Sequence, residues 1–208
     1  MSTKRVIKHP DVRKLEITRA AEILFRKKGY AATSVESIIQ KAGIAKGTFY
    51  YYFKTKQDIL KNLVEQIATN METYFISVIE DNHLSAIQKL KKLLRSPEKK
   101  EKINPSVMKI IHRPENRELQ EELNIIAIKV IAPLLAKVFQ QGKKEGVFNN
   151  TVSVESMQLI LAGSQFVLDS GLFHWSSEQR KKFLKELQRM TEQIAGAKPN
   201  TLSFISSE

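Results

Sequence analysis

The chain of 208 residues contains no cysteine and a single tryptophan, and it has no long apolar run. Without cysteine there can be no disulfide, no thiolate metal site and no cysteine nucleophile. The most apolar window, Ile125–Phe139, is too short to cross a bilayer and is interrupted by Lys129 and Lys137. The basic N-terminus has no apolar signal core. We therefore expect a cytoplasmic protein without a membrane partner.

Catalytic signatures are also missing. The sequence has no nucleophile elbow, no HExxH, no P-loop and no paired-carboxylate constellation. Its histidines are scattered without the spacing of metal ligands. They are His9, His83, His112 and His174. The sequence thus predicts neither an enzyme nor a metal or cofactor site.

What the chain does have is positive charge, concentrated near its N-terminus. Residues 1–60 contain 13 Lys and Arg against 5 Asp and Glu, a net charge of +8, whereas the remainder carries only +4 of the total of +12. A basic N-terminal region is the electrostatic signature of a polyanion partner such as DNA. A merely solvated basic surface is the alternative.

Residues 33–56 have the pattern of two short helices joined by a glycine turn. Thr33 to Glu36 read TSVE, a capping box that begins a helix. Gly43 ends that helix where a left-handed residue is needed. A second helix is predicted from about Ala45, carrying the sequence KGTFYYYF. This is the layout of a helix-turn-helix, whose second helix enters the major groove of DNA.

The second helix has two different faces. Phe49 and Phe53 are four residues apart and share the side that must be buried. Gly47, Thr48 and Tyr51 lie opposite, where a small residue permits close approach and a threonine methyl suits thymine. The alternative is that the three tyrosines only pack inside the protein. The expected DNA-contacting residues here are Ser34, Lys46, Gly47, Thr48, Tyr50, Tyr51, Tyr52, Lys54 and Lys56.

The segment from about Arg13 to Leu60 resembles the DNA-binding domain of the TetR family of bacterial transcriptional regulators. The preceding helix, ITRAAEILFRKKGYAATSV, fits the first helix of that family. The resemblance implies that Thr33 contacts phosphate, that Lys46 to Tyr52 lie along the groove, and that Lys56 is a phosphate anchor. Many family members have His where this chain has Tyr52.

The remaining sequence is helical throughout, which predicts an all-α protein of about nine helices. Expected helices span residues 56–80, 83–95, 105–112, 115–144 with a kink at Pro133, 153–174 and 177–195. The division that we expect is a helix-turn-helix domain at 1–55, a helical effector-binding and dimerisation domain at 56–196, and a polar tail at 197–208.

The last two helices are candidates for a homodimer interface. Small residues on one permit close helix approach, and the other has apolar residues at steps of four, three and four. The TetR resemblance implies a four-helix interface made by these helices, although part of each must also pack on its own domain. The residues are Ala162, Gly163, Phe166, Phe183, Leu187, Met190 and Ile194.

The resemblance also implies a pocket in the larger domain for a small effector that releases DNA. Large adaptable side chains and a few polar groups are the expected lining, although such residues are more often plain core. They are Met71, Tyr74, Met108, Ile111, His112, Asn116, Phe139, Gln165, Phe166 and Asp169.

The sequence therefore predicts a DNA-binding transcriptional regulator. By the usual behaviour of the family it is a repressor, released from a palindromic operator on double-stranded DNA by a mostly apolar effector. The alternative is the same architecture without metabolite control, switched by a protein partner or by abundance alone.

Overall fold

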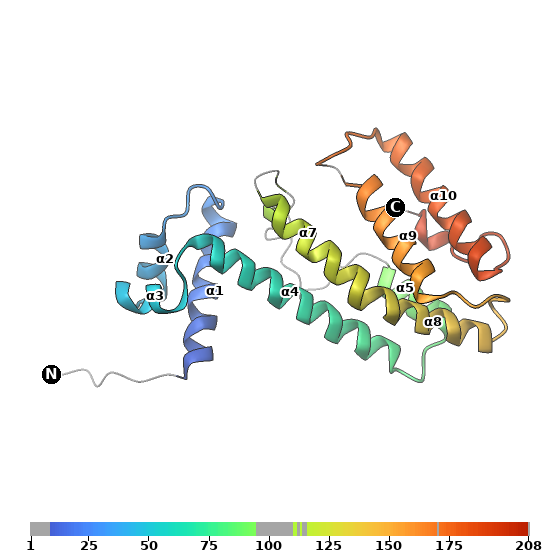
Figure 1. Ribbon diagram of the computed structural model, residues 1–208, viewed down its shortest axis with the longest axis horizontal. Helices are drawn as coiled ribbons and strands as arrows, with labels where there is room; N and C mark the ends of the chain where they lie inside the picture. Colours follow the sequence, from blue (N-terminus) through green and yellow to red (C-terminus); the bar gives the residue numbers. More distant parts are fainter. Residues whose placement is uncertain (1–8, 95–109, 112, 114–115, 170, 208) are drawn as a thin grey trace. The chain divides into compact units, whose positions relative to one another are not determined.

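The structure is a computed structural model that describes residues 9–94, 110–111, 113, 116–169 and 171–207 (Figure 1). Within those ranges the chain forms helices and no strand, which confirms the all-α fold. The predicted helix at 105–112 lies outside the described residues, apart from Ile110 and Ile111, which are helical and buried.

Contacts divide the chain into two compact units. The first comprises the described residues up to Ile67 together with Ile110 and Ile111, and the second comprises the rest. The boundary expected from the sequence lies between residues 55 and 56, at the start of a helix. The first turns of that helix belong to the first unit because Ile59, Leu60 and Leu63 are buried. Asn62 also accepts a hydrogen bond of 3.1 Å from the Thr18 hydroxyl.

The first unit is built from α1 (Pro10–Lys28), α2 (Val35–Ala42), α3 (Lys46–Tyr52) and the start of α4 (Lys56–Ile79). Helix α1 has a proline in its first turn and three basic residues in its last, where each stabilises a helix end. Its buried residues recur at helical spacing, for example Ile17, Ala21 and Leu24. Ile38 of α2 and Phe49 of α3 are also fully buried in this unit.

The second unit contains the remainder of α4 and the helices that follow it. These are α5 (Ala86–Leu94), α7 (Arg117–Ile126), a π-helical turn (Ala127–Ile131), α8 (Ala132–Lys144), α9 (Val154–Val167), α10 (Ser177–Ala195) and a 3-10 turn (Ser203–Ile205). Helix α8 packs against α5 and α9. The π-helical turn lies just before Pro133, which has no N–H to donate, and it marks the irregularity predicted there.

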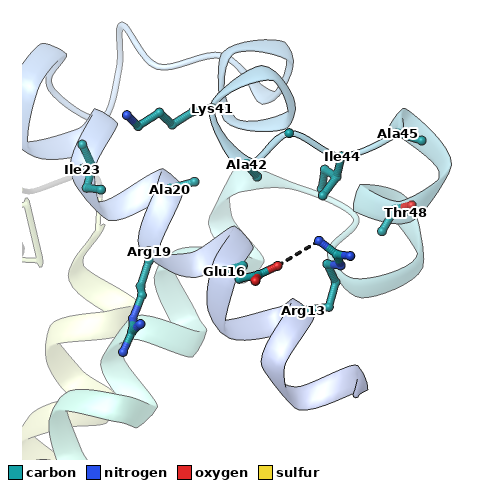
Figure 2. Close-up of a pocket in the computed structure, with 11 residues that line it drawn as sticks. Arg13, Glu16, Arg19, Ala20, Ile23, Lys41, Ala42, Ile44, Ala45 and Thr48 are labelled. Atoms are coloured by element: carbon teal, nitrogen blue, oxygen red, sulfur yellow. Dashed lines mark hydrogen bonds and ion pairs between the residues drawn. The ribbon is translucent and has the colours of Figure 1, made fainter. Parts of the chain in front are cut away.

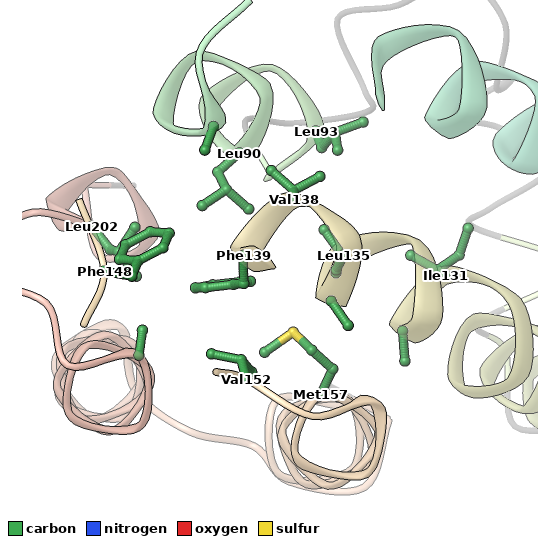
Figure 3. Packing of buried hydrophobic residues seen from close by; sticks show 14 of the residues in the cluster. Leu90, Leu93, Ile131, Leu135, Val138, Phe139, Phe148, Val152, Met157 and Leu202 are labelled. Atoms are coloured by element: carbon green, nitrogen blue, oxygen red, sulfur yellow. The ribbon is translucent and has the colours of Figure 1, made fainter. Parts of the chain in front are cut away.

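The core of the second unit lies around α8 (Figure 3). Phe139 of α8 stacks on Phe148 with ring centroids 5.0 Å apart. Gly142 makes this possible, because a Cβ at that position would overlap the Cδ2 and Cε2 atoms of Phe148. Gly146, at φ 74°, lets the chain reverse so that Phe148 returns to α8. Leu135 and Met157 complete the packing between α8 and α9.

The C-terminal residues pack against this core, so the expected polar tail from residue 197 is a wrong prediction. Leu202 is fully buried and Phe204 nearly so. The buried Glu192 carboxylate of α10 accepts hydrogen bonds from the backbone N–H groups of Leu202 (2.8 Å) and Asn200 (3.2 Å). Two apolar side chains among polar ones are enough to fix the segment when a buried acceptor also holds its backbone.

Candidate nucleic-acid interface

The turn between α2 and α3 has the conformation that its glycine predicts. Gly43 adopts φ 63° and ψ 41°, the left-handed region, and its N–H donates to Gln40 O at 3.2 Å. The next residue, Ile44, donates to Ile39 O at 3.3 Å. These bonds satisfy carbonyls at the end of α2 and reverse the chain into α3. The predicted helix-turn-helix is therefore present.

Helix α3 buries one face and exposes the other, as predicted. Phe49 and Phe53 are buried with ring centroids 6.3 Å apart. Tyr51 on the other side is 78% exposed and Tyr50 is 46% exposed, so these two rings are not simple core. Lys46 and Gly47 are exposed, and a Cβ at Gly47 would meet no atom within 4 Å. Thr48 and Tyr52 are half-buried. The outer face can thus approach another surface closely.

The N-cap of α2 lies one residue after the predicted one. Ser34, and not Thr33, is the N-cap, and its hydroxyl accepts from Ser37 N at 3.1 Å. Thr33 is buried, and its hydroxyl donates to Gly29 O at 2.7 Å. The Thr33 side chain is therefore engaged inside the unit, whereas Ser34 is exposed. The two residues are adjacent and both can cap, so the sequence alone did not separate them.

The start of α4 holds two lysines in different situations. Thr55 caps the helix, because its hydroxyl oxygen accepts from Asp58 N at 3.2 Å. The Asp58 carboxylate in turn accepts hydrogen bonds of 2.9 Å from the backbone N–H groups of Lys54 and Thr55. The Lys54 side chain is exposed. The Lys56 ammonium instead donates to Tyr30 O at 2.8 Å and Thr33 O at 3.0 Å. Lys54 is therefore positioned to reach outward, and Lys56 is occupied by backbone carbonyls.

An open groove of about 620 Å³ lies between α1 and the α2–α3 turn (Figure 2). Arg13 forms a 2.8 Å ion pair with Glu16 in it, and Thr48 of α3 lies at its edge. Arg19 and Lys41 add two further cations to its lining. The groove was not predicted, because it depends on how α1 and α2 pack. Its excess of cations agrees with the concentration of charge in residues 1–60.

The candidate dimer residues form exposed apolar surface on α9 and α10. Phe166 is 57% exposed and Met190 is 46% exposed, while a Cβ at Gly163 would meet nothing within 4 Å. Leu159 is 75% exposed and lies four residues before Gly163 on the same helix; sequence reasoning missed it. Its position in the repeat of Ala162 and Phe166 could have identified it. Phe183 is also exposed, and Ala162, Leu187 and Ile194 are half-buried.

The candidate pocket residues that the structure describes are divided between the two units. Ile111 is buried in the first unit, and Phe139 is core, stacked on Phe148. Met71 and Tyr74 are half-buried on α4, and the Tyr74 hydroxyl donates to Lys92 O at 3.2 Å. Met108 and His112 lie outside the described residues.

The polar candidates lie at the start of α7 and at or just after the end of α9. Gln120 Nε2 donates to Asp169 Oδ2 at 2.7 Å, and Gln120 was not predicted. Gln165, four residues before Asp169, has a buried Oε1 that accepts no hydrogen bond from the described residues. Asn116 is buried at the N-cap of α7. A buried acceptor without a donor is the arrangement that a bound ligand or water would complete.

Metal-binding and membrane-spanning features are not found in the parts of the chain that the structure describes. No three His, Cys, Asp or Glu residues there are grouped so as to hold a metal ion. No helix in those parts combines the length and apolar character needed to span a bilayer.

Comparison with known proteins gives two matches to family models. Residues 17–63 match the model of bacterial regulatory proteins of the tetR family. Residues 99–188 match that of the tetracyclin repressor-like C-terminal domain. The first match covers α2 and α3 entirely, together with parts of the helices on either side. The helix-turn-helix and a large part of the helical remainder are thus each matched by a model of tetracycline-repressor-like regulators.

Individual relatives agree with these matches. The uncharacterized HTH-type transcriptional regulator YfiR of Bacillus subtilis is 31% identical over 65 residues, or 31% of this chain and 32% of YfiR. The aligned stretch thus spans about a third of the length of such curated relatives. The fatty acid metabolism regulator protein of the same organism is 26% identical over 172 residues, covering 80% of this chain and 85% of that protein.

A solved structure shares the fold over nearly the whole chain. The fatty acid degradation regulator FadR from Bacillus halodurans superimposes with a TM-score of 0.56, covering 97% of both chains at 20% identity. At that identity the likeness concerns the fold alone.

Proposed function

The chain belongs to the TetR family of bacterial transcriptional regulators, and from this premise we propose that it is a repressor acting in the cytoplasm. It binds a palindromic operator as a homodimer and leaves it when a small, mostly apolar effector binds. The relatives are transcriptional regulators and not enzymes.

The exposed face of α3 is the observation that carries the proposal. Tyr51 extends from the face of α3 opposite the buried Phe49 and Phe53, and Lys46 is exposed in the first turn of the same helix. Gly47 has no side chain, so the backbone of α3 can approach the base edges of DNA closely at this position. Tyrosine hydroxyls can donate to phosphates, and lysine can reach a guanine or a phosphate. Ser34 and Lys54 add contacts at the starts of α2 and α4.

Dimerisation is supported by the apolar surface on α9 and α10. Leu159, Phe166 and Met190 are large apolar side chains exposed on adjacent helices. Surface of this kind marks a protein interface. Regulators of this family act as dimers, and a two-fold dimer presents two recognition helices to the two halves of a palindrome. The same surface patch on two copies makes a self-complementary interface.

An effector site in the second unit is supported by the polar group near α7 and α9. Gln165 Oε1 is buried without a donor, beside a helix end whose Asp169 is held by Gln120. The half-buried Met71, Tyr74 and Leu161 supply apolar surface in the same unit. The names of the fatty acid regulators among the relatives make an acyl chain the first effector class to test.

Release follows from the continuity of α4. This helix has its first residues in the DNA-binding unit and its last residues in the effector unit. A ligand that favours one position of its second half shifts its first half, and with it the spacing of the two recognition helices. Because half-sites on DNA are at fixed spacing, a small change in that distance breaks several contacts at once.

The test begins with a duplex selected from a random library by the purified protein. Tyr51→Ala and Lys46→Ala should each weaken binding to that duplex at least about tenfold, because each contact is worth about 1–3 kcal/mol and is present twice. Lys137→Ala removes the same charge from an exposed position on α8 and is the control. Sedimentation should show every variant as a dimer. Wild-type affinity in the Tyr51 and Lys46 variants would contradict the assigned helix.

The same complex tests the effector. Fatty acids of increasing chain length are titrated into it, and release that strengthens with length supports an apolar effector. If no chain length releases the duplex, the alternative without metabolite control is favoured.

A further inference from the structure

The ammonium of Lys56 is fully engaged with the turn that joins α1 to α2. It donates to Tyr30 O at 2.8 Å, Thr33 O at 3.0 Å and Ala31 O at 3.3 Å. An ammonium group has three N–H donors and no acceptor, so these carbonyls use all its donors. The Lys56 side chain thus ties the first residue of α4 to three residues of a turn more than twenty positions earlier.

A second layer of contacts surrounds this tie. The Lys56 Nζ atom lies 4.5 Å from the centre of the Tyr30 ring, within the range of a cation–π interaction. The Tyr30 hydroxyl donates to Gln57 Oε1 at 2.6 Å, and the Tyr30 ring meets Phe25 edge-on at 5.0 Å. Burial, and secondly the Asp58 carboxylate, raise the pKa of Tyr30, so the hydroxyl stays protonated as a donor. Two consecutive residues of α4 therefore hold the turn.

We propose that Lys56 is a positioning residue, which fixes the α1–α2 turn on α4 and so places the start of α2 for DNA binding, and that it is not a phosphate anchor. The proposal rests on the DNA-binding function above and departs from the role that the family resemblance implies for Lys56. Reaching a phosphate would break three charge-assisted hydrogen bonds, each stronger than a neutral one. A contact with a solvent-exposed phosphate would have to compensate for the loss of all three hydrogen bonds.

The hydrogen bonds of Lys56 also couple the start of α2 to the position of α4. Thr33, whose carbonyl binds Lys56, immediately precedes the N-cap Ser34 of α2. The Thr33 N–H donates to Tyr30 O at 3.2 Å, so the turn is closed on itself as well as on α4. A displacement of the first turn of α4 is therefore passed to the beginning of the helix-turn-helix, through Lys56 directly to Thr33 and through Gln57 to Tyr30.

Lys54 provides a matched control two residues earlier. Its side chain is exposed, and no hydrogen bond of its ammonium to another described residue is found. It has the same charge and chemistry, and it lies at the same helix start. A phosphate contact at this position is expected of Lys54, so the two lysines should respond differently to the same substitution.

The experiment compares full-length Lys56→Met, Lys56→Arg and Lys54→Met with the wild type, using the duplex that the wild type selects. The slope of affinity against salt should fall in Lys54→Met by about 0.9 for each phosphate that the variant no longer neutralises, and it should not change in Lys56→Met. Both Lys56 variants should bind at least about fivefold more weakly. The flat guanidinium of Lys56→Arg cannot serve three converging carbonyls, although it binds phosphate well.

Amide hydrogen exchange in the free protein measures, without DNA, how firmly Lys56 holds the α1–α2 turn. The Thr33 amide should exchange faster in both Lys56 variants and at the wild-type rate in Lys54→Met. The proposal is overturned if Lys56→Arg binds like the wild type, or if Lys56→Met lowers the salt slope while Thr33 exchange is unchanged. If the wild type selects no duplex, the proposed function fails, whereas the exchange rates still decide whether Lys56 holds the turn.

Discussion

The two units differ in the distance along the chain over which their defining contacts are made. In the first unit, the reversal between α2 and α3 depends on Gly43 and on bonds to Gln40 and Ile39, all close neighbours. In the second, Phe148 and Leu202 pack around α8 from positions far apart in the chain. The helix-turn-helix reversal thus forms from local contacts, although the first unit around it is also held by long-range ones, such as the hydrogen bond from Thr18 to Asn62.

Removing the C-terminal segment is the strongest way to break this comparison. Deletion of residues 198–208 removes the buried side chains of Leu202 and Phe204 and leaves the Glu192 carboxylate without its backbone donors. We expect a loss of about 5 kcal/mol or more in the unfolding free energy of the second unit. Urea denaturation followed by tryptophan fluorescence reports that unit, because Trp175 is the chain's single tryptophan.

Deletion of residues 207 and 208 alone is the control and should leave the midpoint unchanged. Protection of the α2 and α3 amides in the long deletion should stay close to that of the wild type. Equal loss of protection in both units would show that they do not fold independently.

Gly142→Ala tests the close contact between Gly142 and the Phe148 ring in the second unit. The added Cβ would overlap the Phe148 ring and come within 3.1 Å of Ala86 Cβ. Overpacking of this kind costs about 1–3 kcal/mol, outweighing the gain of up to about 1 kcal/mol in helix propensity. Calorimetry measures the change. Adding Phe148→Leu should make the double variant more stable than the sum of the single changes predicts, and strict additivity would rule the contact out.

Substitutions at two glycines of the first unit should have the smallest effects and test its local contacts. Gly43→Ala forces a Cβ into the left-handed region and should cost about 1 kcal/mol of stability. In Gly47→Ala the added methyl group meets no neighbouring atom, and the higher helix propensity of alanine should raise the unfolding free energy by up to about 1 kcal/mol. The same Gly47→Ala should weaken binding to the selected duplex, because its methyl fills the face of closest approach. Thermal denaturation and binding isotherms give both numbers, and a more stable Gly47→Ala with unchanged affinity would place DNA elsewhere.

Helix positions were predictable where a cap or a glycine lies next to a strong periodic pattern. Helix α10 spans the predicted residues 177–195, between the capping box begun by Ser176 and the left-handed Gly196. Helix α9 was predicted to residue 174 and ends at Val167. Its last carbonyls are satisfied by side chains from beyond the helix, with Trp175 Nε1 donating to Val167 O at 2.7 Å and Arg180 donating to Leu168 O at 3.0 Å. Apolar periodicity continues past that point, so the end was not visible in the sequence.

The candidate DNA face was predictable for a similar reason. Phe49 and Phe53 are four residues apart, which sends one face of a short helix inward and the other outward. The partners of Lys56 could not be predicted in this way, because its three carbonyl acceptors belong to a turn that only the packing of α1 against α2 and α4 brings near. Backbone carbonyls leave no residue-specific pattern in a sequence.

By itself, the order of residues determined an all-α chain, a basic N-terminal region and a helix-turn-helix with an inward and an outward face. These follow from charge, helical periodicity and the backbone freedom of Gly43, which act over a few residues. Tertiary structure alone decided that Lys56 faces inward, that Gly142 makes room for Phe148 and that the last residues belong to the core. Each of those depends on a partner brought close by folding, and burial is a property of the assembled fold.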